Sequence, residues 1–338
     1  MEKIKDYNIE FLRFIATIAV VLVHIGICWI SYYGSGATDM QNMIFSTVQH
    51  SMFWAVPVFM MITGRLMMCK IKIDYVKAFG YFKRIGLLLV LFGSVFAWME
   101  LFFTTRQLNM NILIDGINNM LTGNTWKHLW YLYVLLGIYL ILPALNELRD
   151  KHTIIKALTL LIILFTSLFP SLHINIGIRF PIDSIYVGYF LLGYLLYQTK
   201  NISTYKWVCA VMLFITFVIL IIGKHNELIL HKELNWNYSS YTSIITVIQS
   251  SALFYLIISN PGKFDKFCSS TIVKRLNRCS LGIYITHMVW INLIIKITHI
   301  NIMPYNFYAI LPMCLIVLTL SWLTTEILIR LPILKHYL

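Results

Sequence analysis

Long apolar runs recur along almost the whole chain, each followed by a short polar connection. A helix needs about 20 predominantly apolar residues to cross the hydrocarbon core of a bilayer. The pattern therefore predicts an all-α, polytopic membrane bundle of about ten transmembrane helices. We expect these helices near residues 9–30, 50–69, 84–104, 128–146, 154–170, 182–198, 207–223, 242–259, 279–298 and 307–330.

Composition supports this interpretation. Of the 338 residues, 59% are hydrophobic and 12% are charged, whereas a soluble domain has about 25% charged residues. The connections between the apolar runs are short, so we expect a single transmembrane domain over residues 1–338 with no appended soluble domain. No small-residue cleavage site follows the first run, which we therefore expect to be a retained helix and not a signal peptide.

The basic excess has a topological explanation. The net charge is +13, with 27 Lys and Arg residues. If the N-terminus is cytoplasmic, 19 of them lie in the inside segments, 6 in the outside loops, and Arg13 and Arg65 within helices. This asymmetry is the positive-inside pattern and predicts that both termini are cytoplasmic. The charge then indicates attraction to membrane lipids and excludes a nucleic-acid footprint.

The six cysteines show no C-x-x-C spacing. Several fall within predicted helices or cytoplasmic loops. We therefore expect no disulfide framework, no metal site and no permanently bound cofactor.

The first apolar run carries two ionisable side chains, Arg13 and His24. Eleven residues turn a helix by about three turns, so the two lie on one face, separated by roughly 16 Å along the axis. Glu10 is three residues before Arg13 and can pair with it. Arg13 is either a snorkelling side chain at the interface or a functional group. His24 has no interface to reach, so it is either hydrogen-bonded between helices or faces a cavity.

The pattern of Arg, ten residues and His resembles the signature of the membrane-bound acyltransferase family 3. Five further segments are similar to the family in the right order, with Thr63 where serine is commoner and Arg65 where an aromatic residue is usual. They are "PVFMMITGRLM" (57–67), "YFKRIGLLL" (81–89), "HLWYLYVLLGIYLILP" (128–143), "YVGYFLLGYLL" (186–196) and "CSLGIYITHMVWI" (279–291).

This resemblance implies an acyltransferase, most simply an O-acetyltransferase of surface sugars, in a bacterial cytoplasmic membrane. The co-substrate would be cytosolic acetyl-CoA and the acceptor a glycan or a lipid-linked sugar. Such a transfer needs a base to take the hydroxyl proton, and histidine suits this role because its pKa lies near neutrality. His24 is the candidate base.

The donor would be held by residues nearer the cytoplasm. Arg13 would bind a phosphate or a carbonyl of the donor. Lys83 and Arg84 either contact its nucleotide end or are ordinary positive-inside charge. Ser280, Tyr284 and His287 share one helix face, so Tyr284 and His287 either line the donor path or bond within the bundle.

The acceptor would be recognised in the outer half. Glu100 is a candidate for orienting His24 or holding a sugar hydroxyl. Trp130 and Tyr133 belong to an aromatic group at the outer end of the fourth helix, which is either an interfacial belt or a platform for a sugar ring. The other members of this group are Trp126, His128 and Tyr131.

Two charged residues have no assigned catalytic role. Arg65 follows Gly64, whose lack of a side chain allows close approach of a neighbour; we expect Arg65 to snorkel, with a donor contact as the alternative. Glu326 precedes Arg330 by four residues, which predicts an intrahelical ion pair.

The sequence is compatible with other interpretations. Transfer can be direct or can pass through an acyl-enzyme. A polysaccharide or small-molecule transporter would use the same intramembrane charges as a path, and a structural membrane protein would use them for helix packing.

Overall fold

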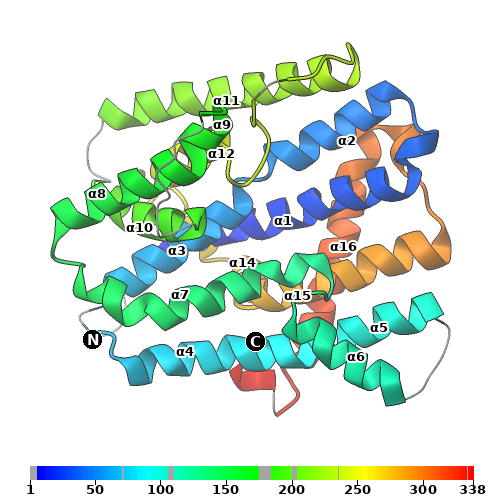
Figure 1. The fold of residues 1–338 in the computed structure, drawn as a ribbon, viewed down its shortest axis with the longest axis horizontal. Coiled ribbons are helices and arrows are strands. Elements are labelled where there is room, and N and C mark those ends of the chain that lie inside the picture. Colours follow the sequence, from blue (N-terminus) through cyan, green and yellow to red (C-terminus); the bar gives the residue numbers. More distant parts are fainter. Residues whose placement is uncertain are drawn as a thin grey trace. The chain divides into compact units, whose positions relative to one another are not determined.

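The computed structural model describes residues 6–70, 72–105, 110–174, 184–199, 204–234, 236–332 and 334–338. Within these ranges the chain forms helices and no strand, as predicted (Figure 1). Its contacts divide it into two compact units. The larger unit comprises residues 1–69 and 151–327, and the smaller unit comprises residues 70–150 and 328–338.

The larger unit contains the first helix and most of the C-terminal half. Its long helices alternate with short 3-10 and π turns. The elements are α1 (Tyr7–Tyr33), η1 (Gly34–Gly36), α2 (Asp39–Ser51), α3 (Ala55–Met68), α8 (His152–Ile163), η4 (Leu164–Leu168), α9 (Phe169–Ser171), α10 (Ile185–Gln198), α11 (Thr204–Leu228), α12 (Ile244–Ile258), α13 (Asp265–Cys268), α14 (Thr271–Arg278), α15 (Ser280–Leu293), η5 (Ile294–Thr298), η6 (Met303–Tyr305) and α16 (Phe307–Leu328).

Helix α1 is the central element of the larger unit. The side chain of Asp6 caps its N-terminus by accepting a hydrogen bond from the amide of Ile9. Its 27 residues give a length of about 40 Å, enough to cross a bilayer. Because small and branched apolar residues cover most of its surface, α1 packs against α2, α3, α12 and α15.

Helices α3 and α10 cross at two glycines. A Cβ on Gly64 would lie 1.8 Å from the carbonyl oxygen of Phe190, and one on Gly193 would lie 2.2 Å from that of Met61. The two backbones therefore touch directly, which only glycine permits. The expectation that Gly64 admits a neighbouring backbone is confirmed.

The smaller unit is built around α4 (Tyr75–Leu88) and α7 (Trp130–Glu147), which pack together. A π turn, η2 (Leu89–Gly93), continues α4 into α5 (Ser94–Thr105). The remaining elements are α6 (Met110–Leu121), η3 (Lys127–Leu129) and η7 (Leu334–His336).

Each of the ten predicted apolar runs coincides with a helical segment. Eight helical stretches in the described ranges are long and apolar enough to span a membrane. The runs predicted at 182–198 and 242–259 form the shorter helices α10 and α12, and residues 182–183 lie outside the described ranges. Helices α2 and α6 were not predicted, because their sequences mix polar and apolar residues.

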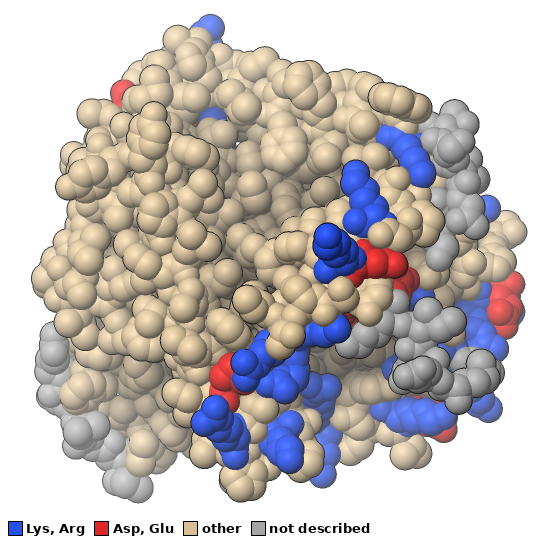
Figure 2. Space-filling view, turned by 180° about the vertical axis from the view of Figure 1, so that it is seen from behind, with Lys and Arg blue, Asp and Glu red and all other residues tan. Residues whose placement is uncertain are grey.

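The surface is that of a protein surrounded by lipid. Helix α11 exposes Trp207, Phe214 and Ile222, of which Trp207 is 81% accessible. The face drawn in Figure 2 has a broad area without charged side chains, while its Lys, Arg, Asp and Glu side chains gather towards one side. Exposed apolar area of this extent would be unfavourable in water, so we place these helices in a membrane.

Candidate functional site

His24 lies in the second half of α1, on a partly buried position. Its Nδ1 is 2.9 Å from the carbonyl oxygen of Val20, one turn earlier. A carbonyl oxygen can only accept a hydrogen bond, so in the neutral ring Nδ1 carries the proton and Nε2 carries the lone pair. This tautomer presents Nε2 as the basic nitrogen.

A second histidine lies against His24. His287 is fully buried on α15, and its ring centroid is 4.7 Å from that of His24, with the planes inclined by 64°. Its Nδ1 is 3.2 Å from the carbonyl oxygen of Ile283, so in the neutral ring of His287 Nδ1 also carries the proton. The ring of Tyr284 lies 6.1 Å from that of His287. The predicted common face of α15 therefore meets α1 at His24.

Arg13 lies nearer the start of α1. Its Nη1 donates to Oε1 of Glu10 at 2.9 Å, so the predicted pair is confirmed. Both side chains are about one-quarter exposed (25% and 24%). The carbonyl oxygen of Glu10 accepts a hydrogen bond from Nδ2 of Asn277 at 3.0 Å. Through this contact α14 lies beside the stretch of α1 that carries Arg13.

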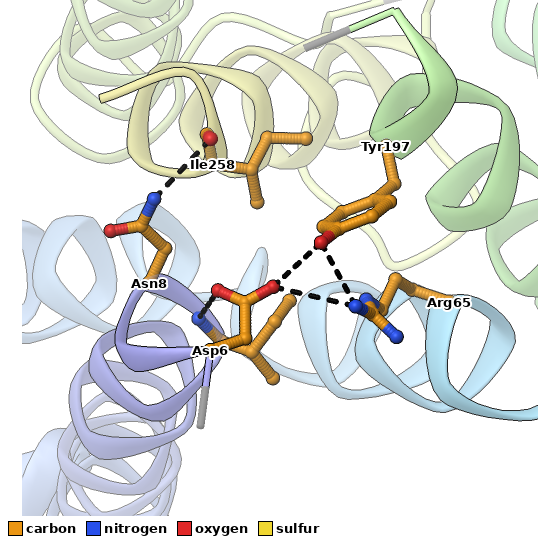
Figure 3. A network of polar contacts seen from close by, with 6 residues as sticks. Asp6, Asn8, Arg65, Tyr197 and Ile258 are labelled. Atoms are coloured by element: carbon orange, nitrogen blue, oxygen red, sulfur yellow. Dashed lines mark hydrogen bonds and ion pairs between the residues drawn. The ribbon is translucent and has the colours of Figure 1, made fainter. Parts of the chain in front are cut away.

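Arg65 takes part in a polar network at the same end of α1 (Figure 3). Its Nη2 donates to the hydroxyl of Tyr197 at 2.9 Å and lies 3.5 Å from Oδ2 of Asp6, which also accepts from that hydroxyl at 2.8 Å. The guanidinium carbon lies 4.1 Å from the centroid of the Tyr197 ring. The prediction of a snorkelling Arg65 is therefore wrong, because the side chain bonds within the bundle and ties α3 and α10 to the start of α1.

Glu326 also has partners that spacing did not predict. Its Oε2 accepts from Nη2 of Arg278 at 3.0 Å, and its Oε1 lies 3.4 Å from Nε of Arg275. Glu326 thus joins α16 to α14 in place of the expected pair with Arg330. Burial, with the Glu326 charge as a smaller cause, raises the pKa of the neighbouring Cys279 thiol to about 11.

The other predicted site residues belong to the smaller unit. Oε2 of Glu100 accepts from the indole nitrogen of Trp126 at 3.1 Å. The hydroxyl of Tyr133 donates to the carbonyl oxygen of Met120, and Trp130 is partly buried.

The larger part of the aromatic group packs inside this unit. Trp126, His128 and Tyr131 are buried, and Trp126 stacks on Phe96 at 4.4 Å between ring centroids. These three side chains therefore form a local core, where the sequence suggested a belt or a sugar platform.

The predicted basic pair lies on α4. Lys83 is exposed, whereas Arg84 contacts the C-terminal segment of the same unit. Nε of Arg84 donates to the carbonyl oxygen of Tyr337 at 2.9 Å.

A polar group outside the predicted site residues lies at the end of α11. Nζ of Lys224 is 2.8 Å from Oε2 of Glu227, which also accepts from the hydroxyl of Tyr238. Lys224 is only 4% exposed. Its spacing of three residues from Glu227 was the available signal, whereas Tyr238 follows an irregular segment and no pattern points to it.

Comparison with known protein families distinguishes an enzyme from a transporter or a structural protein. A family model described as an acyltransferase domain matches residues 6–326. The chain belongs to the acyltransferase 3 family. This match covers both units and the segments from His24 to His287, so it favours a membrane acyltransferase over a transporter or a structural protein. No curated protein and no solved structure matched the chain.

Proposed function

We propose that this acyltransferase moves an acetyl group from cytosolic acetyl-CoA to a hydroxyl of a cell-surface or lipid-linked sugar, with His24 as the general base. The contact between His24 Nδ1 and the Val20 carbonyl carries the proposal, because it leaves the lone pair of the neutral ring on Nε2. We further propose that the membrane is the bacterial cytoplasmic membrane.

The reaction is a direct transfer in this proposal. Nε2 of His24 takes the proton of the sugar hydroxyl while the oxygen attacks the thioester carbonyl carbon. The carbon–sulfur bond breaks, the acetyl group stays on the sugar oxygen, and the CoA thiolate leaves and receives the proton. General base catalysis of this kind contributes about 10²- to 10⁴-fold in rate.

The donor side of the site is assigned to Arg13, Tyr284 and His287. A guanidinium suits a phosphate because it offers several N–H donors in a planar fork. Arg13 would hold the diphosphate of acetyl-CoA, and the thin pantetheine arm would follow α1 towards His24. Tyr284 and His287 would line the end of that path. Lys83 and Arg84 are proposed to attract the nucleotide end from the smaller unit.

Glu100, Trp130 and Tyr133 remain the proposed acceptor contacts of the smaller unit. A carboxylate accepts hydrogen bonds from sugar hydroxyls, and aromatic rings offer flat apolar faces. No metal or permanent cofactor is required by this proposal.

Transfer of labelled acetyl from acetyl-CoA to membrane-derived glycans tests the proposal. We expect turnover by the wild-type protein in proteoliposomes and a loss of at least 100-fold in His24→Gln. His50→Gln is the matched control, because His50 is also a partly buried helical residue whose Nδ1 lies 2.7 Å from its own i−4 carbonyl oxygen, that of Ser46. Equal turnover in wild type and His24→Gln would overturn the role of His24, and no turnover in wild type would overturn the proposed activity.

A further inference from the structure

The segment after α11 surrounds a surface cavity of about 620 Å³ in the larger unit. Volumes of about 300–1,000 Å³ are typical of small-molecule sites. Its walls combine aromatic and polar side chains from α11 and the loop that follows. The lining residues that matter here are Glu227, His231, Lys232, Glu233, Trp236 and Tyr238.

One wall of this loop cavity is held rigid by the Lys224, Glu227 and Tyr238 contacts. Lys224 is buried, and its ammonium lies 5.2 Å from the centroid of the Tyr238 ring. Burial and the hydrogen bond to Glu227 raise the pKa of Tyr238, so its hydroxyl stays protonated and donates to the carboxylate. Glu227 is 44% exposed on its side chain. A fixed carboxylate therefore faces the cavity with capacity to accept further hydrogen bonds.

The same wall carries two aromatic rings. The centroids of Trp236 and Tyr238 lie 5.5 Å apart, with the planes inclined by 37°. Tyr238 is buried in a small apolar cluster with Leu220 and Ile245, and Trp236 packs against that cluster while it stays partly exposed. The cluster fixes the loop, so Trp236 has a defined place beside Glu227.

Most of the charges around the cavity are paired with a charge of opposite sign. Lys224 compensates Glu227, and the exposed side chains of Lys232 and Glu233 have opposite sign. His231 lies 3.4 Å from Asp39 at the start of α2. A cavity with balanced charge has no strong preference for an anion or a cation. Aromatic faces beside hydroxyl-accepting groups fit a neutral ligand with both apolar and hydroxyl-bearing surfaces.

We infer that the loop cavity is a subsite for a neutral sugar unit of the acceptor, remote from the hydroxyl that is acetylated. The inference rests on the proposed function for its role in acyl transfer. Helix α2 packs against both α1, which carries His24, and α11, whose end lines the cavity (Figure 1), so the two sites lie on different helices that α2 connects. The bound unit is therefore a neighbour of the reacting sugar along a glycan. Binding energy from such a remote unit positions the reacting end.

Binding is measured first, without any acyl transfer. Saturation-transfer difference NMR on the full chain in nanodiscs uses three probes with one ring type, methyl β-glucoside, glucosamine and glucuronate. We expect the neutral probe to give a signal at least threefold stronger than either charged probe. The signal of the neutral probe should fall by at least 80% in Trp236→Leu and should be mostly retained in Trp236→Tyr. The matched control Trp207→Leu, on the lipid-exposed face of α11, should keep all of it.

Glu233→Lys is a second variant in case Trp236→Leu fails to fold. Glu233 is exposed, so its substitution should not disturb folding. This change makes the cavity positive, so glucuronate should become the preferred probe. Signals that are independent of both positions, or a charged probe preferred by the wild type, would overturn the subsite.

The role in transfer is tested by kinetics with two acceptors. For an oligosaccharide acceptor, Trp236→Leu and Glu233→Lys should raise KM at least threefold and leave kcat and the KM of acetyl-CoA unchanged. For a monosaccharide acceptor, KM should not change. If the probes bind but both variants keep the wild-type KM for the oligosaccharide, the cavity has no role in acceptor recognition. Absence of all turnover would contradict the proposed function, and the NMR binding data alone would then test the cavity.

Discussion

The rings of His24 and His287 lie 4.7 Å apart, one from the first helix of the chain and one from α15. Each ring directs its Nδ1 to the carbonyl one turn earlier on its own helix. Both neutral imidazoles therefore adopt the same tautomer, with the lone pair on Nε2, and they lie side by side. This arrangement places His287, which we assign to the end of the donor path, directly against the proposed base.

Substitution of His287 should lower kcat more than it affects donor binding. His287→Asn keeps an amide that can donate to the Ile283 carbonyl but removes the second ring nitrogen. We expect a fall in kcat of at least tenfold, with the thermal midpoint within about 2 °C of wild type. An unchanged kcat in folded His287→Asn would show that the second ring only fills space.

Gly64→Ala should prevent normal packing of α3 on α10. The added Cβ would meet the Phe190 carbonyl oxygen at 1.8 Å, so the helices must separate. Overpacking costs about 1–3 kcal/mol, and more where backbone must move. We expect a large loss of folded yield and a lower thermal midpoint in detergent. Gly137→Ala is the control, since nothing lies within 4 Å of its added Cβ. Equal stability of the two variants would contradict the direct backbone contact.

The Asp6 network should contribute more than an ordinary helix cap. Asp6→Ala removes the cap of α1 and the partner of Arg65 and Tyr197, whereas Asp74→Ala removes only the cap of α4. Loss of a cap costs about 0.5–2 kcal/mol. We expect Asp6→Ala to lower the thermal midpoint more than Asp74→Ala, and Tyr197→Phe to give part of the difference. A larger effect from Asp74→Ala would contradict the network.

Thiol labelling tests the predicted orientation. Cys69 is exposed and precedes the basic segment that we expect in the cytoplasm. A membrane-impermeant maleimide at pH 7 should label it in inverted vesicles and not in right-side-out vesicles, with Cys69→Ser as the control.

Two other thiols should stay unlabelled in that experiment. Burial raises the pKa of both Cys268 and Cys279 to about 11, so their reactive thiolate forms only towards that pH. Labelling of Cys69 only from the opposite side would reverse the topology.

The sequence alone was sufficient to predict those features of the structure that depend on a periodic pattern. Apolar runs located every long helix, and i, i+3 spacing located the Glu10–Arg13 pair. Spacing of four residues failed for Glu326, because a local pair competes with partners from elsewhere in the chain. Arg278, on another helix, reaches the carboxylate.

The candidate site shows the same division. The positions of Arg13 and His24 on one helix follow from helical geometry, but their partners do not. His287 reaches His24 only after α15 packs on α1, and Asp6 meets Tyr197 through a similarly distant contact. Such long-range contacts leave no periodic signal in a single sequence. The loop cavity was missed for the same reason, since its walls come from an irregular segment.

Steady-state kinetics of Arg13→Ala and His24→Ala with two donors can separate donor binding by Arg13 from proton transfer by His24. Acetyl-CoA carries the diphosphate that Arg13 is proposed to hold, and acetyl-pantetheine lacks it. We expect Arg13→Ala to raise KM at least tenfold for acetyl-CoA alone, and His24→Ala to lower kcat about 10²- to 10⁴-fold with both donors. Undiminished kcat in folded His24→Ala would contradict the role of His24 as the base.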